Sequence, residues 1–188
     1  MPLSSPVSRE PLHKRRVECR GFRRSDGLFD IEGHIVDTKA YSFSNEFRGE
    51  ILPGEALHDM WIRLTVDDEM RVHAVEAVTD SAPYRVCPEI TPNFQVLKGL
   101  RIAPGWTQAV KDRLGGVQGC THLVELLGPV ATVAYQTMVS IRKKRLAETP
   151  KGKRPSVLDS CHAYSSKGEY VREKWPDFYT GPAPSAGE

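Results

Sequence analysis

The sequence has few of the features that assign a protein to a class at once, beginning with cysteine. Its 188 residues contain four cysteines, which lie far apart and form no CxxC pair. The first residues, MPLSSPVSREPLHKRR, carry no apolar run behind their charges, so they do not resemble a secretory signal. We therefore expect a cytoplasmic protein with reduced thiols and no disulfide bonds.

An excess of one charge and the glycine motifs of nucleotide binding are also missing. The chain has 26 basic and 24 acidic side chains, whereas a nucleic-acid-binding domain usually has a more one-sided balance. No glycine pattern of the Rossmann or Walker type stands between a strand and a helix. The sequence thus disfavours a nucleic-acid partner and a nucleotide cofactor.

A long hydrophobic run without polar residues is absent as well. The most apolar stretch, residues 123–141, contains Glu125, Gln136 and an internal Gly128-Pro129, and it only just reaches the length of a membrane span. It predicts a buried helix with a kink at Pro129, and no membrane partner is expected.

The composition that remains is typical of one globular domain. Hydrophobic residues make up 39% and charged residues 27% of a chain long enough for one sizeable core. Residues 1–12 predict a flexible tail, and residues 13–148 predict a single domain. Residues 149–188 begin with a basic linker and continue as a C-terminal extension. We expect this extension to pack on the domain, with a hairpin at residues 166–168.

Alternating apolar and polar residues predict two antiparallel hairpins in the first half of the chain. The first spans residues 13–39 with a turn at residues 25–27, and residues 42–57 predict a connection. The second hairpin has an apolar face made by Met60, Ile62, Leu64, Val66, Met70, Val72, Ala74 and Val78. The opposite face of its first strand carries Asp59, Trp61, Arg63 and Thr65.

The second half of the chain predicts helices. Residues 93–100, which end near Gly99, and residues 106–114 each predict a short helix. A longer helix is expected from Thr121, as N-cap, to Arg145, because cations are favoured at a helix C-terminus. Strands followed by helices indicate an α+β fold, with an antiparallel sheet from the N-terminal half packed by C-terminal helices.

The order of three short motifs resembles the iron–sulfur scaffold proteins of the IscU/NifU type. Leu57-His58-Asp59 precedes the second hairpin, Leu97-Lys98-Gly99 ends a short helix, and Val117-Gln118-Gly119-Cys120 opens the long helix. The resemblance covers roughly residues 55–145 and implies an IscU/NifU-like fold. It also implies that most cluster ligands are lost, because only Cys120 holds its place while Leu57-His58 replaces the first cysteine.

A second resemblance covers nearly the whole chain. It is carried by the segments LHKRR, DGLFDIEGH, HDMW, KGLRI, GWT, GCTHL and DSCH. Through them the chain is similar to the bacterial family catalogued as domain of unknown function 2889, which supports the fold but implies no particular activity.

The first candidate site is the glycine-rich turn that leads into the predicted long helix. Such a turn exposes free N–H groups that attract anions, and it places Cys120 two residues before His122. The alternative is that the glycines only separate two helices and that Cys120 is a small buried residue. A second candidate is the adjacent pair His58 and Asp59 at the start of the second hairpin. These two residues could act as a base or bind a metal, or they could be an exposed strand end.

Two further segments contribute candidate binding residues. Tyr84 and Arg85 lie between prolines in a loop over the same end of the sheet, where Arg85 could hold a carboxylate or phenolate. Cys161 and His162 are adjacent, so on a strand they would point to opposite faces, and only His162 is expected to line a pocket.

The sequence therefore predicts a small-molecule enzyme that uses acid–base chemistry, and it leaves open whether a divalent metal assists. Its form would be a lyase or hydrolase acting on an aromatic compound. The catalytic candidates are Asp59, His58, His122 and Cys120, and the substrate-binding candidates are Arg85, Tyr84 and His162. A metal would bind among Asp59, Cys120 and His122. The alternative is a non-enzymatic metal or iron–sulfur binding protein, and a homo-oligomer is left open.

Overall fold

The structure is a computed structural model that describes residues 3–141 and 152–182. The chain forms two compact units, Met1–Ile141 and Arg142–Glu188. Residues 3–12 of the predicted tail are exposed and belong to no helix or strand. The predicted domain end at residue 148 and the first linker residues lie outside the described residues. The packing of the C-terminal extension on the domain stays a prediction.

The first unit is built around a four-stranded antiparallel sheet in the order β1-β2-β5-β6. Its strands are β1 (His13–Arg23), β2 (Phe29–Lys39), β5 (Ala56–Val66) and β6 (Val72–Ser81). A small separate hairpin of β3 (Phe43–Asn45) and β4 (Gly49–Ile51) stands where the sequence predicted only a connection. The predicted α+β class, with an antiparallel sheet, is confirmed.

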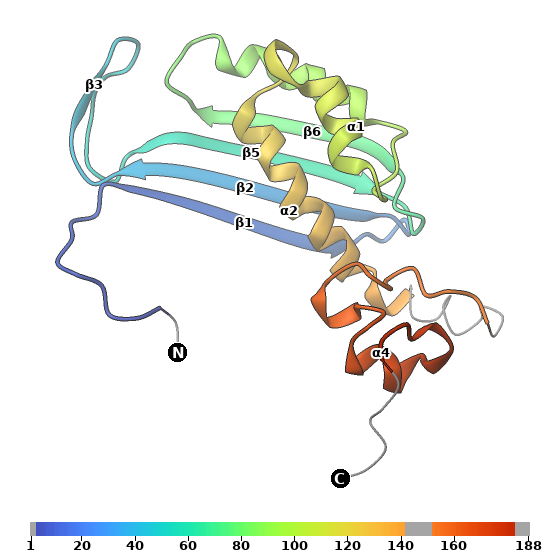
Figure 1. Cartoon of the computed structure of the whole chain (residues 1–188). Coiled ribbons are helices and arrows are strands. Elements are labelled where there is room, and N and C mark those ends of the chain that lie inside the picture. The colour runs from blue at the N-terminus through green and yellow to red at the C-terminus, as the bar shows by residue number, and fades with distance from the viewer. Residues whose placement is uncertain (1–2, 142–151, 183–188) are drawn as a thin grey trace. The chain divides into compact units, whose positions relative to one another are not determined.

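One face of this sheet is apolar and packs against the helices (Figure 1). Its buried side chains on the two central strands are Phe29, Ile31, Ile35, Met60, Ile62, Leu64 and Val66. They occupy every second position, as the pleat of a strand requires. The opposite face carries charged ladders, in which Arg63 forms ion pairs with Glu32 and Glu76.

The apolar face of β6 departs from the predicted alternation. Val72 and Val75 are buried, whereas Ala74 is exposed and Val78 keeps 39% of its surface exposed. The cause is an irregularity in strand pairing, where Val66 pairs with Val72 and Thr65 pairs with Ala74, so that β6 contributes one extra residue. Such a bulge reverses which positions point inward. The predictions for Ala74 and Val78 were therefore wrong.

Helical segments follow the sheet in the chain. They are η1 (Cys87–Leu97), α1 (Trp106–Leu114), η2 (Gly116–Gln118) and α2 (Thr121–Thr137). The bounds of α1 agree with the prediction. The helix predicted over residues 93–100 is instead η1, a series of 3₁₀ turns that begins earlier and contains Pro88 and Pro92. Each proline lacks the N–H that a regular α-helix would use.

The α2 helix lies across the apolar face of the sheet (Figure 1). It begins at Thr121 as predicted, but the N-cap residue is Cys120, and the helix continues through Pro129. It ends at Thr137 with Met138 as its C-cap, residues 139–141 are helical again, and residues 142–145 of the predicted helix lie outside the described part of the chain. Within residues 3–141 and 152–182, no helix has both the length and the apolar character needed to cross a bilayer.

Two glycines allow α2 to approach the sheet closely. A Cβ atom at Gly33 of β2 would lie 2.7 Å from Val130 Cγ2, and one at Gly21 of β1 would overlap the Thr137 side chain. Both positions are on the helix side of the sheet. Any larger residue would push α2 away from the strands, and with it the residues at the start of α2.

The second unit contains short helical segments within its described residues. They are η3 (His162–Tyr164), α4 (Glu169–Lys174) and η4 (Pro176–Phe178). The aromatic rings of Tyr164, Tyr170 and Trp175 pack together, with centroids 5.7 to 6.0 Å apart. The predicted hairpin at residues 166–168 was wrong, because Gly168 is the N-cap of α4.

Candidate functional site

The candidate site lies on the helix side of the sheet, at the end where α2 begins. β1 contributes His13 and Arg15, β2 contributes Asp37, and β5 contributes His58 near its start, while His122 lies in the first turn of α2. Asp37 shares a face of β2 with Phe29, Ile31 and Ile35, which is why its side chain is only 1% exposed. A carboxylate in such a place must be paired with hydrogen-bond donors.

Arg15 supplies that pairing. Its Nε lies 2.8 Å from Asp37 Oδ1, and its Nη2 lies 2.8 Å from Asp37 Oδ2. The third guanidinium nitrogen, Nη1, lies 2.5 Å from Glu125 Oε2 of α2. This two-pronged contact is the strongest form of an arginine–carboxylate pair, and it joins β1, β2 and α2.

Three histidines surround the same carboxylate. His58 Nδ1 lies 3.1 Å and His122 Nε2 lies 3.8 Å from Asp37 Oδ2, and His13 Nε2 lies 3.2 Å from Oδ1. The rings of His58 and His122 face each other with centroids 3.8 Å apart. The side chains of His58 and His122 keep 12% and 24% of their surface exposed, so the pair is largely buried but not sealed.

The environment shifts the protonation of this cluster. Burial and the proximity of His122 hold the pKa of His58 below its ordinary value, although Asp37 opposes the shift. Burial and the charge of Arg15 likewise lower the pKa of His122. For Asp37, burial alone would raise the pKa, but the hydrogen bonds and charge of Arg15 outweigh it and the pKa is lowered. The cluster thus has an ionised carboxylate beside two neutral imidazoles at neutral pH.

Cys120 joins this group from the N-cap of α2. Its Sγ lies 3.9 Å from His122 Nδ1 and 3.8 Å from Met60 Sδ. The predicted proximity of Cys120, His122 and His58 is therefore found. The thiol is half-buried against the apolar core.

Asp59 is placed on the other face of the sheet from His58. Its Oδ1 lies 2.6 Å from His34 Nε2, and the His34 ring stacks on Trp61 with a centroid distance of 3.6 Å. Neighbouring residues of a strand point to opposite sides, so Asp59 belongs with Trp61 and not with His58. The expected grouping of Asp59 with Cys120 and His122 is not formed. Asp37 is the carboxylate beside His58, where the sequence analysis expected Asp59.

Tyr84 and Arg85 gather with the β3–β4 hairpin. The Arg85 guanidinium lies over the Phe47 ring, 4.5 Å from its centroid, and both residues line a shallow pocket with Glu46 and Tyr84. Asn45 Nδ2 donates to the carbonyl of Pro83 and so ties the loop to the hairpin. A role of Arg85 or Tyr84 in substrate binding stays a prediction.

His162 and Cys161 belong to the second unit. The expected strand is absent at this place, since Cys161 is the N-cap of η3 and His162 is its first residue. Both side chains are exposed. The participation of His162 in the site stays a prediction.

Asp37, His58 and His122 could also hold a metal ion. One ligand atom from each lies within 4.8 Å of the others, which no other group of histidine, cysteine or acidic residues achieves within the described chain. Two imidazoles and a carboxylate are a common ligand set for zinc or iron. The obstacle is Arg15, whose positive charge is in contact with both Asp37 oxygens.

In the comparison with known proteins, residues 13–136 match a family described as "protein of unknown function (DUF2889)". The chain belongs to the DUF2889 family. The matched region holds the whole sheet, α1 and nearly all of α2, and therefore includes every residue of the Asp37 cluster.

No curated protein and no solved structure matches the chain. The IscU/NifU-like fold thus has no support from a structural relative of this DUF2889 protein. Among the described residues, the group able to hold an ion contains no cysteine, whereas iron–sulfur clusters are held mainly by thiolates.

Sequence reasoning missed Asp37, Arg15 and His13. A signal was present for Asp37, because the alternation of β2 puts it on the same face as Ile31 and Ile35. An acidic residue on the apolar face of a strand requires a partner, which makes it a candidate for function.

Proposed function

We propose that this DUF2889 protein is an enzyme that performs acid–base chemistry on a small organic molecule at the Asp37–His58–His122 cluster. The observation that supports the proposal best is the contact of His58 Nδ1 with the buried Asp37 carboxylate at 3.1 Å. A carboxylate that accepts a hydrogen bond from one imidazole nitrogen fixes the tautomer and leaves the other nitrogen as a base.

In the proposed reaction, His58 Nε2 takes a proton from the substrate while Nδ1–H donates to Asp37. The negative carboxylate stabilises the imidazolium that forms, and Arg15 keeps Asp37 ionised and in position. The imidazolium of His58 would then return this proton to the leaving group, with His122, whose ring faces that of His58, orienting it. The low pKa of both histidines favours the neutral imidazole, which a base requires at the start of the reaction.

A lyase or hydrolase acting on an aromatic compound is the form of this chemistry that we propose to test first. The assay first measures turnover of a panel of aromatic esters, hydroxy acids and ethers by the unchanged protein. The turnover of His58→Gln is then measured on the substrate that is found. General-base catalysis contributes about 10²- to 10⁴-fold, and the variant should lose a factor in this range. The matched control is His73→Gln, because His73 also pairs with a carboxylate, Asp67, at 2.8 Å but is an exposed residue near the start of β6.

An Asp59→Asn variant distinguishes the two faces of the sheet. Asp59 was the base expected from the sequence, and Asp37 is the carboxylate that contacts His58. If Asp59→Asn loses turnover while His58→Gln keeps it in full, the catalytic base belongs to the His34–Asp59 pair and the proposal is overturned.

Metal binding without catalysis is the second candidate function. It is favoured by the ligand atoms of Asp37, His58 and His122, which lie within 4.8 Å of one another. We rank it below the enzyme because a cation would have to displace Arg15 from Asp37. Elemental analysis of untagged protein tests it: a stoichiometric divalent metal that is lost in the His58→Gln/His122→Gln variant would reverse the ranking.

A further inference from the structure

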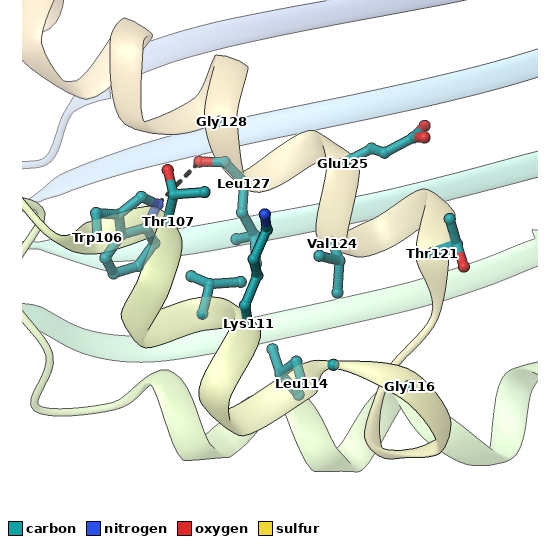
Figure 2. A pocket seen from close by; sticks show the side chains of 12 residues that line it. Trp106, Thr107, Lys111, Leu114, Gly116, Thr121, Val124, Glu125, Leu127 and Gly128 are labelled. Atoms are coloured by element: carbon teal, nitrogen blue, oxygen red, sulfur yellow. Dashed lines mark hydrogen bonds between the residues drawn. The ribbon is translucent and has the colours of Figure 1, made fainter.

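A groove between α1 and α2 has the properties of a separate small-molecule site. It has a volume of about 360 Å³, in the range of ligand pockets. Its apolar wall is formed by Trp106, Val110, Leu114, Val124 and Leu127. Figure 2 shows Trp106, Leu114, Val124 and Leu127 between the two helices, with Trp106 fixed by the hydrogen bond from its Nε1 to the Leu127 carbonyl at 3.1 Å.

The charges at this groove are not balanced. Lys111 extends from α1 in the direction of α2 (Figure 2), and its ammonium group makes no hydrogen bond or ion pair with any residue that the structure describes. Glu125 also lines the groove, but its carboxylate is already paired with Arg15 at 2.5 Å. The groove therefore has one uncompensated positive charge beside an apolar wall.

Gly128 provides an independent sign that the groove is kept open. It lies inside α2, where glycine costs about 0.5–1 kcal/mol relative to alanine. Unlike Gly33, it is not required by contact with another element, because a Cβ atom at Gly128 would meet no heavy atom within 4 Å outside its chain neighbours and the backbone of α2. Gly128 lines the groove, so a side chain at this position would enter the space that a ligand would use.

We infer that the α1–α2 groove binds a small apolar carboxylate, with its ring against the wall of Trp106, Leu127 and Val124 and its carboxylate on Lys111. The apolar wall selects the ring, the ammonium group selects the anion, and the volume limits the ligand to one or two rings. This inference stands apart from the acid–base proposal, because none of the groove residues is His58, His122 or Asp37.

The test is an NMR titration with benzoate and 2-naphthoate, and with their amides as uncharged counterparts. We expect saturable shifts of the Trp106 indole N–H and of the Gly128 amide, with tighter binding of the carboxylates. Lys111→Met should weaken carboxylate binding about tenfold, the effect of roughly 1.4 kcal/mol, and leave the amides unchanged. The matched control Lys98→Met removes another exposed lysine, outside the groove, and should have no effect.

Gly128→Leu should abolish binding by filling the groove while the protein stays folded. If this variant does not fold, Thr107→Phe fills the groove from an exposed position of α1. His58→Gln should bind as tightly as the unchanged protein, so failure of the acid–base proposal would not affect this result. The inference is overturned if the carboxylates give no saturable shifts, if Gly128→Leu binds them normally, or if the same signals shift only with protein concentration, which would indicate a second copy in the groove.

Discussion

Replacement of Asp37 by asparagine tests the centre of the candidate site without needing a substrate. The change keeps the shape of the side chain but removes the charge that Arg15 contacts at 2.8 Å through two nitrogens. Removing one partner of a buried ion pair costs about 3–5 kcal/mol. The Arg15 side chain is 35% exposed and keeps Glu125, so water and that second partner reduce the loss to about 2–3 kcal/mol.

Equilibrium unfolding in urea measures this loss. For a chain of this size, about 2–3 kcal/mol corresponds to a decrease in Tm of roughly 5–10 °C. The control is Asp67→Asn, since Asp67 also pairs with a histidine but lies on an exposed turn, and its loss should stay near 1 kcal/mol or below. Equal stability of Asp37→Asn and the unchanged protein would show that the Arg15–Asp37 pair is not formed as described.

The same variant has a second readout that a purely structural role would not produce. Asp37 raises the pKa of both His58 and His122 against the larger effect of burial. Without its charge, both pKa values should decrease further, which the pH dependence of the imidazole NMR signals will show. A rise of the pKa of His58 in Asp37→Asn would refute the electrostatic reasoning.

Three further predictions concern pH, packing and cofactor content. Because the pKa values of His58 and His122 are lowered in the folded state, their contribution to stability is complete well above about pH 6.5 and decreases as the pH falls below it. The urea midpoint should therefore decline from pH 7 to pH 5 and decline less in His58→Gln/His122→Gln, while the lowered pKa of Asp37 adds a further loss only below about pH 4. Gly33→Ala should lower the free energy of unfolding by about 1–3 kcal/mol, because the new Cβ lies 2.7 Å from Val130 Cγ2. A further Val130→Ala substitution should lower it less in Gly33→Ala than in the unchanged chain. Anaerobic purification and reconstitution should give no iron–sulfur absorbance, and a stable brown protein with stoichiometric iron and sulfide would contradict this expectation.

The strands were predictable because burial on one face leaves a period of two in the sequence. The inward face of β5 agrees with its pattern at all of Met60, Ile62, Leu64 and Val66. The same pattern could not give the inward face of β6, because a bulge is a property of the pairing between two strands. For η1, local helical propensity did not reveal a run of 3₁₀ turns around two prolines.

The candidate site was predictable in part for a similar reason. Cys120, His122 and His58 could be grouped because they stand at the ends of elements that the sequence places together. The alternation of β5 already separates His58 from Asp59, and that of β2 already places Asp37 among apolar residues. The contact between Arg15 and Asp37 depends on how β1 aligns with β2, which no pattern within either strand determines.

That alignment has a consequence for folding. β1 is an edge strand with exposed residues along most of its length, so hydrophobic burial alone specifies its register on β2 only weakly. In the native register Arg15 stands directly opposite Asp37. A slip by two residues would keep each side chain on its face but would leave the Asp37 carboxylate beside Val17 or His13, without its guanidinium. The one acidic group buried on the inner face of β2 therefore fixes the register of β1, because a shifted hairpin would leave that carboxylate unpaired once α2 covers it.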